Sequence, residues 1–346
     1  MGPLIQPSDT TAGDTNMRAI LSKAPGLPDT LVLEDVPSPV AKAGEILISV
    51  KAVGVNFPDF LIIQDMYQYK PQRPFSPGGE ISGVVKAVGE GVTAFKVGDK
   101  VFGSTGAGGM AEEIVVHASR MNALPDFMPF EEAAALLMTY GTSHYALKDR
   151  GKIQPGEKLL VLGAAGGVGL AAVELGVAMG AEVIAAASTQ EKVDFAISKG
   201  ASKGFVYPQN PLDRNQQKEL SETIKEISGG GVDVVYDGVG GDYAEPAVRA
   251  LNWDGRFLVI GFPAGIPKLP LNLTLLKSCQ IVGVFWGAFV ARDPKAHADN
   301  LADLFRLYKE GKIKPHISNR YPLERAADAI KELSERRAMG KVVVTI

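Results

Sequence analysis

The sequence contains little cysteine and little histidine, and both scarcities limit its chemistry. Cys279 is the only cysteine and there are four histidines among 346 residues. A single thiol excludes an intramolecular disulfide and any metal site built from several cysteines. The histidines have no second ligand at metal-site spacing, so packed or surface positions are expected for His117, His144, His297 and His316. No Gly-x-Ser-x-Gly segment is present, which leaves serine hydrolysis without support.

The chain also lacks an excess of positive charge and a long apolar run. Lys and Arg number 36 against 39 Asp and Glu, a net charge of −3, so no global basic surface for nucleic acid is expected. No apolar stretch approaches the roughly 18 residues that span a bilayer. Residues 1–16 lack the charged-then-apolar pattern of a signal peptide. We expect a cytoplasmic protein whose residues 1–16 form a flexible N-terminal extension before a first strand at Met17.

Two patterns divide the rest of the chain. From residue 17 to about residue 123, short apolar runs are broken by Gly, Pro and Asp, which is typical of a compact β-rich domain or barrel. From about residue 158, strand and helix patterns alternate as in a doubly wound parallel sheet. The tail is too short to fold alone and should return to the first domain. The expected α/β fold therefore has one domain at 17–140 with 291–346 and another at 141–290, the second with strands at 182–187, 205–207, 232–236, 256–260 and 280–286.

A glycine-rich turn follows the apolar strand that ends at Leu162. The turn runs from Gly163 to Gly169, with Ala164 in place of the first motif glycine, and a helical pattern follows it. Glycines let the backbone approach phosphate groups, and the helix start offers free N–H groups and the positive end of its dipole. We therefore expect a dinucleotide pyrophosphate to contact Ala165, Gly166, Gly167 and Val168.

The end of the next strand bears on which nicotinamide cofactor is used. Sites for NAD place a carboxylate there, whereas residues 185–187 are all alanine. Ser188 can donate to a 2′-phosphate and Lys192 can reach it one helical turn later, so NADPH is favoured over NADH. Two alternatives stand beside this interpretation. Ser188 with Glu191 also matches a helix capping box, and Lys192 could be a solvated surface residue.

Six ordered motifs together resemble those of one family. They lie at residues 54–59, 77–85, 97–101, 164–169, 236–241 and 340–343. With them the chain is similar, over nearly all of residues 17–346, to the zinc-free quinone oxidoreductase (zeta-crystallin-like) group of the medium-chain dehydrogenase/reductase superfamily. The resemblance implies a GroES-like β-rich catalytic domain plus a Rossmann cofactor domain. It also implies a homodimer formed along the sixth strand, at 281–286, which would otherwise be an open sheet edge.

The departures from the alcohol dehydrogenase branch of that superfamily indicate a metal-free reaction. Asn56 and Gly79 occupy the positions where that branch has a cysteine and a histidine on catalytic zinc, and neither can replace them as ligands. Hydride from NADPH is therefore expected to go to a small-molecule quinone. Two alternatives remain: an alkene reductase acting on enones or enoyl thioesters, or a non-catalytic role like that of the crystallins and vesicle-associated relatives.

The resemblance also implies roles for individual residues. Tyr67 is the expected proton donor, although it could simply pack a cleft wall, and Leu61 replaces a second pocket tyrosine found in some bacterial relatives. Asn56 is expected beside the nicotinamide ribose, and Glu80 is expected to be structural. The resemblance further implies cofactor contacts from Thr142, Tyr207, Phe262 and Lys341. The alternatives are that Thr142 only caps its helix, that Tyr207 is only packed, and that Lys341 is a solvated residue at the start of a strand.

Overall fold

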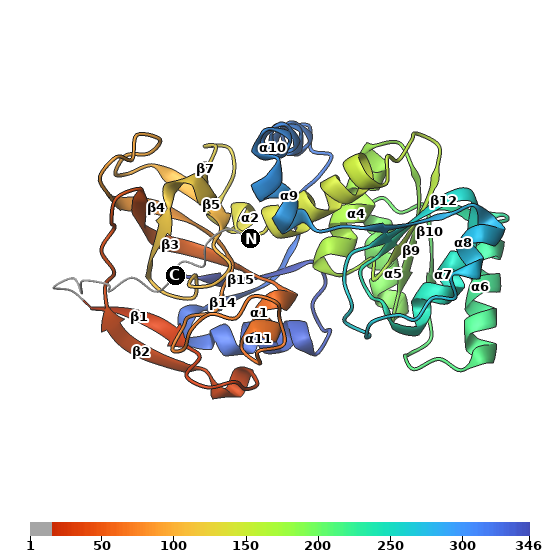
Figure 1. The fold of residues 1–346 in the computed structure, drawn as a ribbon, viewed down its shortest axis with the longest axis horizontal. Helices are drawn as coiled ribbons and strands as arrows, with labels where there is room; N and C mark the ends of the chain where they lie inside the picture. The colour runs from red at the N-terminus through yellow and green to blue at the C-terminus, as the bar shows by residue number, and fades with distance from the viewer. Residues whose placement is uncertain (1–15) are drawn as a thin grey trace. The chain divides into compact units, whose positions relative to one another are not determined.

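The computed structural model describes residues 16–346 and divides into two compact units. Unit 1 contains the described residues up to Met138 together with Pro315–Ile346, and unit 2 contains Thr139–Lys314. The expected extension at 1–15 lies outside the described residues, whereas Asn16 already belongs to the first strand. Figure 1 labels the elements of both units.

Unit 1 is built mainly from antiparallel strands. A seven-stranded sheet has the order β14-β15-β3-β4-β5-β7, with β6 paired to β3, and β1 and β2 form a separate pair. The C-terminal strand β15 completes this sheet by pairing antiparallel with β3, as expected for the returning tail. The elements are β1 (Asn16–Leu21), β2 (Val32–Pro37), β3 (Glu45–Val55), α1 (Phe57–Ile62), β4 (Glu80–Val88), β5 (Lys100–Ser104), β6 (Glu113–His117), β7 (Met121–Ala123), α2 (Phe130–Ala133), β14 (Ile317–Pro322), α11 (Ala326–Ser334) and β15 (Lys341–Thr345).

Unit 2 is a six-stranded parallel sheet of order β10-β9-β8-β11-β12-β13, flanked by helices (Figure 1). Its central strands are apolar along their length because helices cover both faces. The expected α/β class, with a β-rich domain and a doubly wound parallel sheet, is confirmed. The elements are α3 (Thr142–His144), β8 (Lys158–Leu162), α4 (Gly167–Ala178), β9 (Glu182–Ala187), α5 (Gln190–Ser198), β10 (Lys203–Val206), α6 (Arg214–Ser228), β11 (Val232–Asp237), α7 (Ala244–Arg249), β12 (Leu251–Val259), α8 (Asn272–Lys277), β13 (Gln280–Gly283), α9 (Trp286–Arg292) and α10 (Pro294–Lys309).

Two details differ from the sequence expectations. The sixth strand ends at Gly283, and Trp286 instead begins α9 with its side chain buried. Residues 291–314 belong to unit 2, where α10 contacts the segment before β8 through Asp303 with His144 and Asn300 with Lys148. That segment contains α3, which is flanked by wider π-helical turns at Leu137–Gly141 and Tyr145–Arg150, a geometry often found at functional sites.

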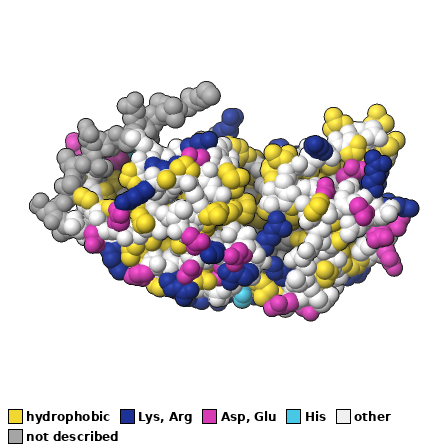
Figure 2. Space-filling view, turned by 90° about the horizontal axis from the view of Figure 1, so that it is seen from below, with side chains coloured by type: hydrophobic (Ala, Val, Ile, Leu, Met, Phe, Trp, Pro, Cys, Tyr) yellow, Lys and Arg dark blue, Asp and Glu magenta, His cyan; other side chains and the backbone are white. Residues whose placement is uncertain are grey.

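Two surface properties accompany this fold. Over the described residues, no helix combines the length and the hydrophobicity needed to cross a membrane. On the face drawn in Figure 2, basic and acidic side chains are intermingled rather than separated by sign. This distribution agrees with the small net charge of −3.

Candidate functional site

A buried charged cluster lies where three segments of unit 1 meet. Asn56 directly follows β3, Glu80 begins β4, and Lys341 begins β15. The Lys341 Nζ donates to Asn56 Oδ1 at 2.7 Å and to Glu80 Oε2 at 3.1 Å, and Asn56 Nδ2 donates to the same Glu80 oxygen at 2.9 Å. The structure thus brings Asn56 and Lys341 together. The solvated position considered for Lys341 is wrong, because this residue is only 3% exposed.

The ion pair in this cluster is fully enclosed. Glu80 is 0% exposed, and its second oxygen, Oε1, accepts the backbone N–H of Met138 at 3.0 Å. A carboxylate removed from water in this way is stable only beside a cation and hydrogen-bond donors. Lys341 supplies the cation, and two of its three ammonium N–H groups are used by Asn56 and Glu80. The expectation that Glu80 is structural agrees with this geometry.

Asp59, on α1, fixes the backbone on both sides of this cluster. Its Oδ2 accepts the N–H of Asn56 at 2.8 Å, and its Oδ1 accepts the N–H groups of Gly78 and Gly79 at 3.1 Å each. Burial raises the pKa of this carboxyl to about 6, against the opposing effect of the backbone donors. Asp59 therefore links the backbone at Asn56 to the loop that contains Gly79.

The donor set of this cluster does not fit catalytic zinc. Zinc takes thiolate, imidazole or carboxylate ligands, whereas the chain offers an amide at Asn56 and no side chain at Gly79. A Cβ at residue 79 would lie 3.0 Å from the Gly106 carbonyl oxygen, so the backbone there leaves little room for a ligand side chain. Within residues 16–346, no group of three or more His, Cys, Asp or Glu side chains could hold a metal ion.

Tyr67 follows α1 on the same segment as Asp59. Its ring is half-buried and packs against the apolar core of unit 1. Burial raises the pKa of its hydroxyl, against the opposing effect of the Gln68 side chain. The hydroxyl is therefore protonated at neutral pH, as a proton donor must be, but its catalytic role stays a prediction.

In unit 2 the glycine-rich turn joins β8 to α4. Gly166 is the N-cap residue of α4, so Ala165, Gly166, Gly167 and Val168 form the last part of the turn and the first turn of the helix. The N–H groups there have no partner within the helix and point along its positive end. A Cβ at Gly169 would lie 2.1 Å from the Gly163 oxygen, whereas one at Gly166 would meet no protein atom closer than 3.5 Å. The turn is closed on its inner side and open at Gly166.

A hydroxyl chain beneath this turn was not anticipated from the sequence. Ser143 Oγ donates to the carbonyl oxygen of Val168 at 2.9 Å and lies 2.7 Å from the hydroxyl of Tyr236. Both side chains are fully buried. Ser143 directly follows Thr142, the first residue of α3. The chain therefore links the helix that carries Thr142 to the first turn of α4 and to β11.

Asp237 shapes the next loop at the same edge of the sheet. Its Oδ1 accepts the N–H groups of Val239 at 2.9 Å and Gly240 at 2.8 Å, and burial raises the pKa of the carboxyl. Gly240 has φ +73°, and a Cβ there would lie 3.2 Å from the Cα of Phe262. The Phe262 side chain is 45% exposed, so it is free to contact a ligand lying over this loop.

The residues expected at the adenosine end follow β9 and β10. Thr189, not Ser188, caps α5, and its Oγ1 accepts the N–H of Lys192 at 3.3 Å. The capping-box alternative for Ser188 is therefore wrong, which leaves its hydroxyl available to a ligand. Tyr207 is 9% exposed and its ring lies 4.7 Å from that of Tyr243. Most of the Tyr207 side chain is therefore packed, as its alternative interpretation held.

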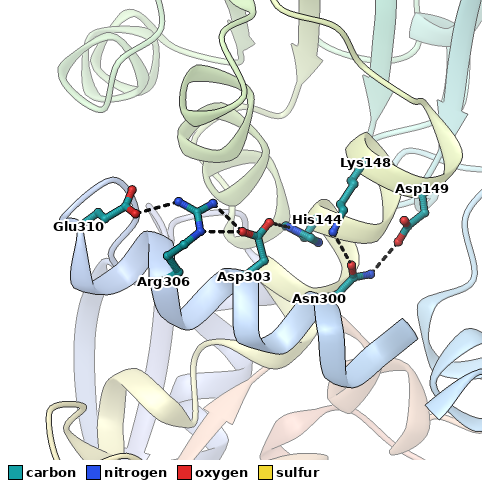
Figure 3. Close-up of polar contacts among 7 residues, drawn as sticks. All are labelled: His144, Lys148, Asp149, Asn300, Asp303, Arg306 and Glu310. Carbon is teal, nitrogen blue, oxygen red and sulfur yellow. Dashed lines mark hydrogen bonds and ion pairs between the residues drawn. The ribbon is translucent and has the colours of Figure 1, made fainter. Parts of the chain in front are cut away.

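A polar network holds the segment that contains Thr142 against α10, as Figure 3 shows. The ring of His144 is buried, and its Nε2 lies 2.8 Å from Asp303 Oδ2; burial lowers the pKa of this histidine. Asn300, also on α10, accepts from Lys148 at 3.0 Å and donates to Asp149 at 2.6 Å, both of which lie in the π-helical turn that follows α3. His144 is thus a packed residue, as expected, and it helps to fix the position of the helix start at Thr142.

The predicted site residues therefore form two groups, one in each unit. Unit 1 holds Asn56, Lys341 and Tyr67, and unit 2 holds the other predicted residues along the carboxyl edge of the parallel sheet and at the start of α3. Sequence reasoning missed Asp59, Ser143, Tyr236 and Asp237. For Asp237 and Tyr236 a signal existed, since they end a predicted strand and precede a glycine loop, where ligands of such sheets bind.

Comparisons with known proteins agree with this arrangement. The alcohol dehydrogenase GroES-like domain family matches residues 42–126, which confirms the GroES-like expectation for the first domain. The zinc-binding dehydrogenase family matches residues 210–344. The chain is 37% identical to quinone oxidoreductase-like protein 2 of Bos taurus over 319 residues, 91% of this chain and 89% of that protein. It is 34% identical to the synaptic vesicle membrane protein VAT-1 homolog of Homo sapiens, over 91% of this chain and 83% of that protein.

Solved structures show the same similarity in three dimensions. The quinone oxidoreductase of Thermus thermophilus, whose structure was also solved in complex with NADPH, is 32% identical with a TM-score of 0.81, over 95% of this chain and all of that one (100%). A mycobacterial protein solved in complex with NADPH is also 32% identical, with a TM-score of 0.87 over 95% of this chain and 100% of that one.

Proposed function

This chain belongs to the quinone oxidoreductase group of the medium-chain dehydrogenase/reductase superfamily, and we propose that it transfers hydride from NADPH to a quinone without zinc. The observation that carries the proposal is the Asn56–Glu80–Lys341 cluster. In it the Asn56 amide accepts from Lys341 and donates to Glu80, and neither this amide nor Gly79 offers a ligand of the kind that zinc takes. A reductase without a metal acts on an acceptor that is already electrophilic, such as a quinone.

The residues of the chain divide the work of such a reaction. NADPH, when bound, supplies two electrons and a proton as hydride from C4 of its nicotinamide, and a second proton completes the hydroquinone. The turn at Gly166 and the start of α4 would hold the pyrophosphate, and in unit 1 Lys341 and Asn56 would offer a cation and an amide to a ligand. Ser143 and Tyr236 hold the turn and Thr142 in place from below.

The choice of NADPH rests on the end of β9. Ala187 ends the strand without a carboxylate, and Ser188 and Lys192 offer a hydroxyl donor and a cation to a 2′-phosphate. The NADPH complexes of two similar structures support the same assignment. Substitution Lys192→Glu is expected to lower kcat/KM for NADPH about tenfold or more, since it replaces an attraction by a repulsion. Equal use of NADPH and NADH by the unaltered protein would contradict the assignment.

An alkene reductase is the second candidate, with Tyr67 as its proposed proton donor. The half-buried, protonated hydroxyl could deliver a proton to carbon after hydride transfer to the β-position of an enone or enoyl thioester. Quinone reduction needs no such donor because oxygen takes protons from solvent. Tyr67→Phe should therefore reduce enone turnover strongly and quinone turnover little. Unchanged turnover of both substrates would remove Tyr67 from the mechanism.

A steady-state assay of NADPH oxidation against quinones, enones and an enoyl-CoA tests the proposal directly. Turnover of quinones supports it, and turnover confined to enones or the thioester selects the second candidate. Saturable NADPH binding without turnover of any acceptor would instead indicate the non-catalytic role.

We also propose that the protein is a homodimer. Strand β13 lies at the end of the parallel sheet, and Ile281 on it and Phe285 beyond it are 37% and 60% exposed. Open apolar edges of this kind are usually paired or covered. Sedimentation equilibrium that fits a single monomer mass would contradict this. The cytoplasmic location expected from the sequence stays a prediction, which fractionation of the source cells would test.

A further inference from the structure

Helices α6 and α7 lie side by side in unit 2 (Figure 1), and a groove of about 730 Å³ runs between them. We call this space the α6–α7 groove. Among the described residues that line it, only Pro246 is apolar, and that residue is buried. The residues expected to contact NADPH do not line it. Its charged lining residues are Arg214, Lys218, Glu222 and Lys225 on α6 and Glu245 and Arg249 on α7.

Both carboxylates of the groove already have partners. Glu245 Oε1 accepts from Arg249 Nε at 2.9 Å and from its Nη2 at 2.6 Å. The Glu222 carboxylate lies 3.8 Å from the Lys218 ammonium, one helical turn earlier on α6. The groove has four basic and two acidic side chains, so two positive charges are left without a partner.

Those two charges belong to Arg214 and Lys225. In the part of the chain that the structure describes, neither side chain forms an ion pair or a hydrogen bond. Arg214 is the first residue of α6, where the positive end of the helix dipole makes a cation unfavourable. Burial lowers the pKa of the nearby Lys277, and the charge of Lys225 lowers it further. A bound anion would relieve this repulsion between like charges.

A buried hydroxyl in the same groove also lacks a partner. Ser221 is 4% exposed, and its Oγ forms no hydrogen bond with any described residue. A serine inside a helix can donate to the carbonyl oxygen four residues earlier, as Ser228 on the same helix does to Ile224 at 2.6 Å. A buried hydroxyl without an acceptor lowers stability, because it has given up water for nothing. Ser221 therefore offers an unused O–H donor to a ligand in the groove.

The three unpaired groups follow one another along α6. Lys225 is one turn after Ser221, about 6 Å along the helix axis, and Arg214 is two turns before it, about 10 Å. Guanidinium, ammonium and hydroxyl donors suit phosphate oxygens, which accept several charge-assisted hydrogen bonds. The polar walls offer no surface to an acyl chain, so a soluble compound fits the groove better than a lipid does.

We propose that the α6–α7 groove binds a small soluble compound that carries phosphate groups, with Ser221, Lys225 and Arg214 as its donors. A phosphate group supplies the acceptor that the Ser221 hydroxyl lacks and the negative charge that the two cations lack. The site is separate from the dinucleotide turn, and it does not depend on the proposed reduction.

Isothermal titration calorimetry of the full chain with inorganic pyrophosphate tests this site. Excess NADPH is present, so that the dinucleotide turn does not take up the probe. Ser221→Ala should weaken pyrophosphate binding about fivefold, the effect of one hydrogen bond, and Lys225→Gln should weaken it by up to about the same factor. Ser228→Ala is the matched control, because its hydroxyl is bonded within α6 and does not line the groove. Its affinity for pyrophosphate should be unchanged.

Thermal unfolding without pyrophosphate separates binding from a structural role. Ser221→Ala should melt at the temperature of the unaltered protein or slightly above it, since it removes an unpaired buried hydroxyl and alanine favours a helix. A lower melting temperature would show that the hydroxyl supports the fold, and it would overturn the inference.

Three calorimetric results would also overturn it. They are no pyrophosphate binding by the unaltered protein, unchanged affinity in Ser221→Ala, and an equal loss of affinity in Ser228→Ala. None of these measurements involves hydride transfer. Each of the three results therefore leaves the proposed reductase function standing, and NADPH oxidation tests that function separately.

Discussion

The same added methyl group should have different effects at two glycines of the dinucleotide turn. At Gly169 it should lower stability, and at Gly166 it should weaken NADPH binding. In Gly169→Ala the new Cβ would lie 2.1 Å from the Gly163 oxygen, 2.8 Å from its carbonyl carbon and 3.0 Å from the Ala164 Cα. All three are backbone atoms, and normal carbon contacts are about 3.5–4.0 Å, so β8 and α4 must move apart by about 1 Å. Overpacking of a close-packed core costs about 1–3 kcal/mol and more when backbone must shift. We expect a loss of about 3 kcal/mol, which lowers the melting temperature of unit 2 by roughly 6–12 °C.

Gly166→Ala is the matched partner of that variant. The added Cβ meets no protein atom closer than 3.5 Å, and the backbone at φ −78° and ψ 172° suits alanine. Its melting temperature should equal that of the unaltered protein, whereas its affinity for NADPH should fall about tenfold or more, because the methyl group stands where the pyrophosphate approaches. Differential scanning calorimetry and NADPH fluorescence titration measure the two effects. A stable Gly169→Ala protein, or a Gly166→Ala protein with unchanged NADPH affinity, would refute the reasoning.

Two further predictions concern the buried groups of unit 1. Lys341→Met leaves the enclosed Glu80 carboxylate without its cation and should lower the free energy of unfolding by about 3–5 kcal/mol. Adding Glu80→Gln should restore most of that stability, as measured by chemical denaturation. An equally unstable double variant would contradict the pairing. Asp59 has a pKa raised to about 6 when folded, against an ordinary value of 3.8, so the folded state binds the proton more tightly. Its contribution to stability is complete below about pH 4 and falls by up to about 3 kcal/mol as the pH rises through about 6. Asp59→Asn should remove that slope from the pH dependence of unfolding, and an unchanged slope would assign it to other groups.

Local features of the chain were predictable because they depend on neighbouring residues. Strand β9 occupies Glu182–Ala187 as the apolar run indicated, and the turn at Gly163–Gly169 follows from glycine chemistry at the end of a strand. Boundaries were less certain where two signals compete. The apolar run at 280–286 was interpreted as one strand, but the chain leaves the sheet after Gly283 and buries Trp286 in α9 instead.

The position of α10 shows how burial can override a sensible inference about the tail. The tail after residue 290 was expected to return as one piece, and its strands β14 and β15 do return to unit 1. Helix α10 instead belongs to unit 2, where Asp303 pairs with His144 and Asn300 accepts from Lys148. A helical pattern shows that one face will be buried, but it does not identify the surface that buries it.

The sequence by itself determined the class of the protein: a β-rich domain, a doubly wound parallel sheet and a dinucleotide turn. Those properties follow from periodicity, turn chemistry and the functional groups present. Only the tertiary structure decided which polar groups meet. Lys341 pairs with Glu80 across 261 residues, and Ser143 meets Tyr236 across 93. Such pairs form because adjacent strands and packed helices place them together and exclude water, and no local pattern in the chain encodes that distance.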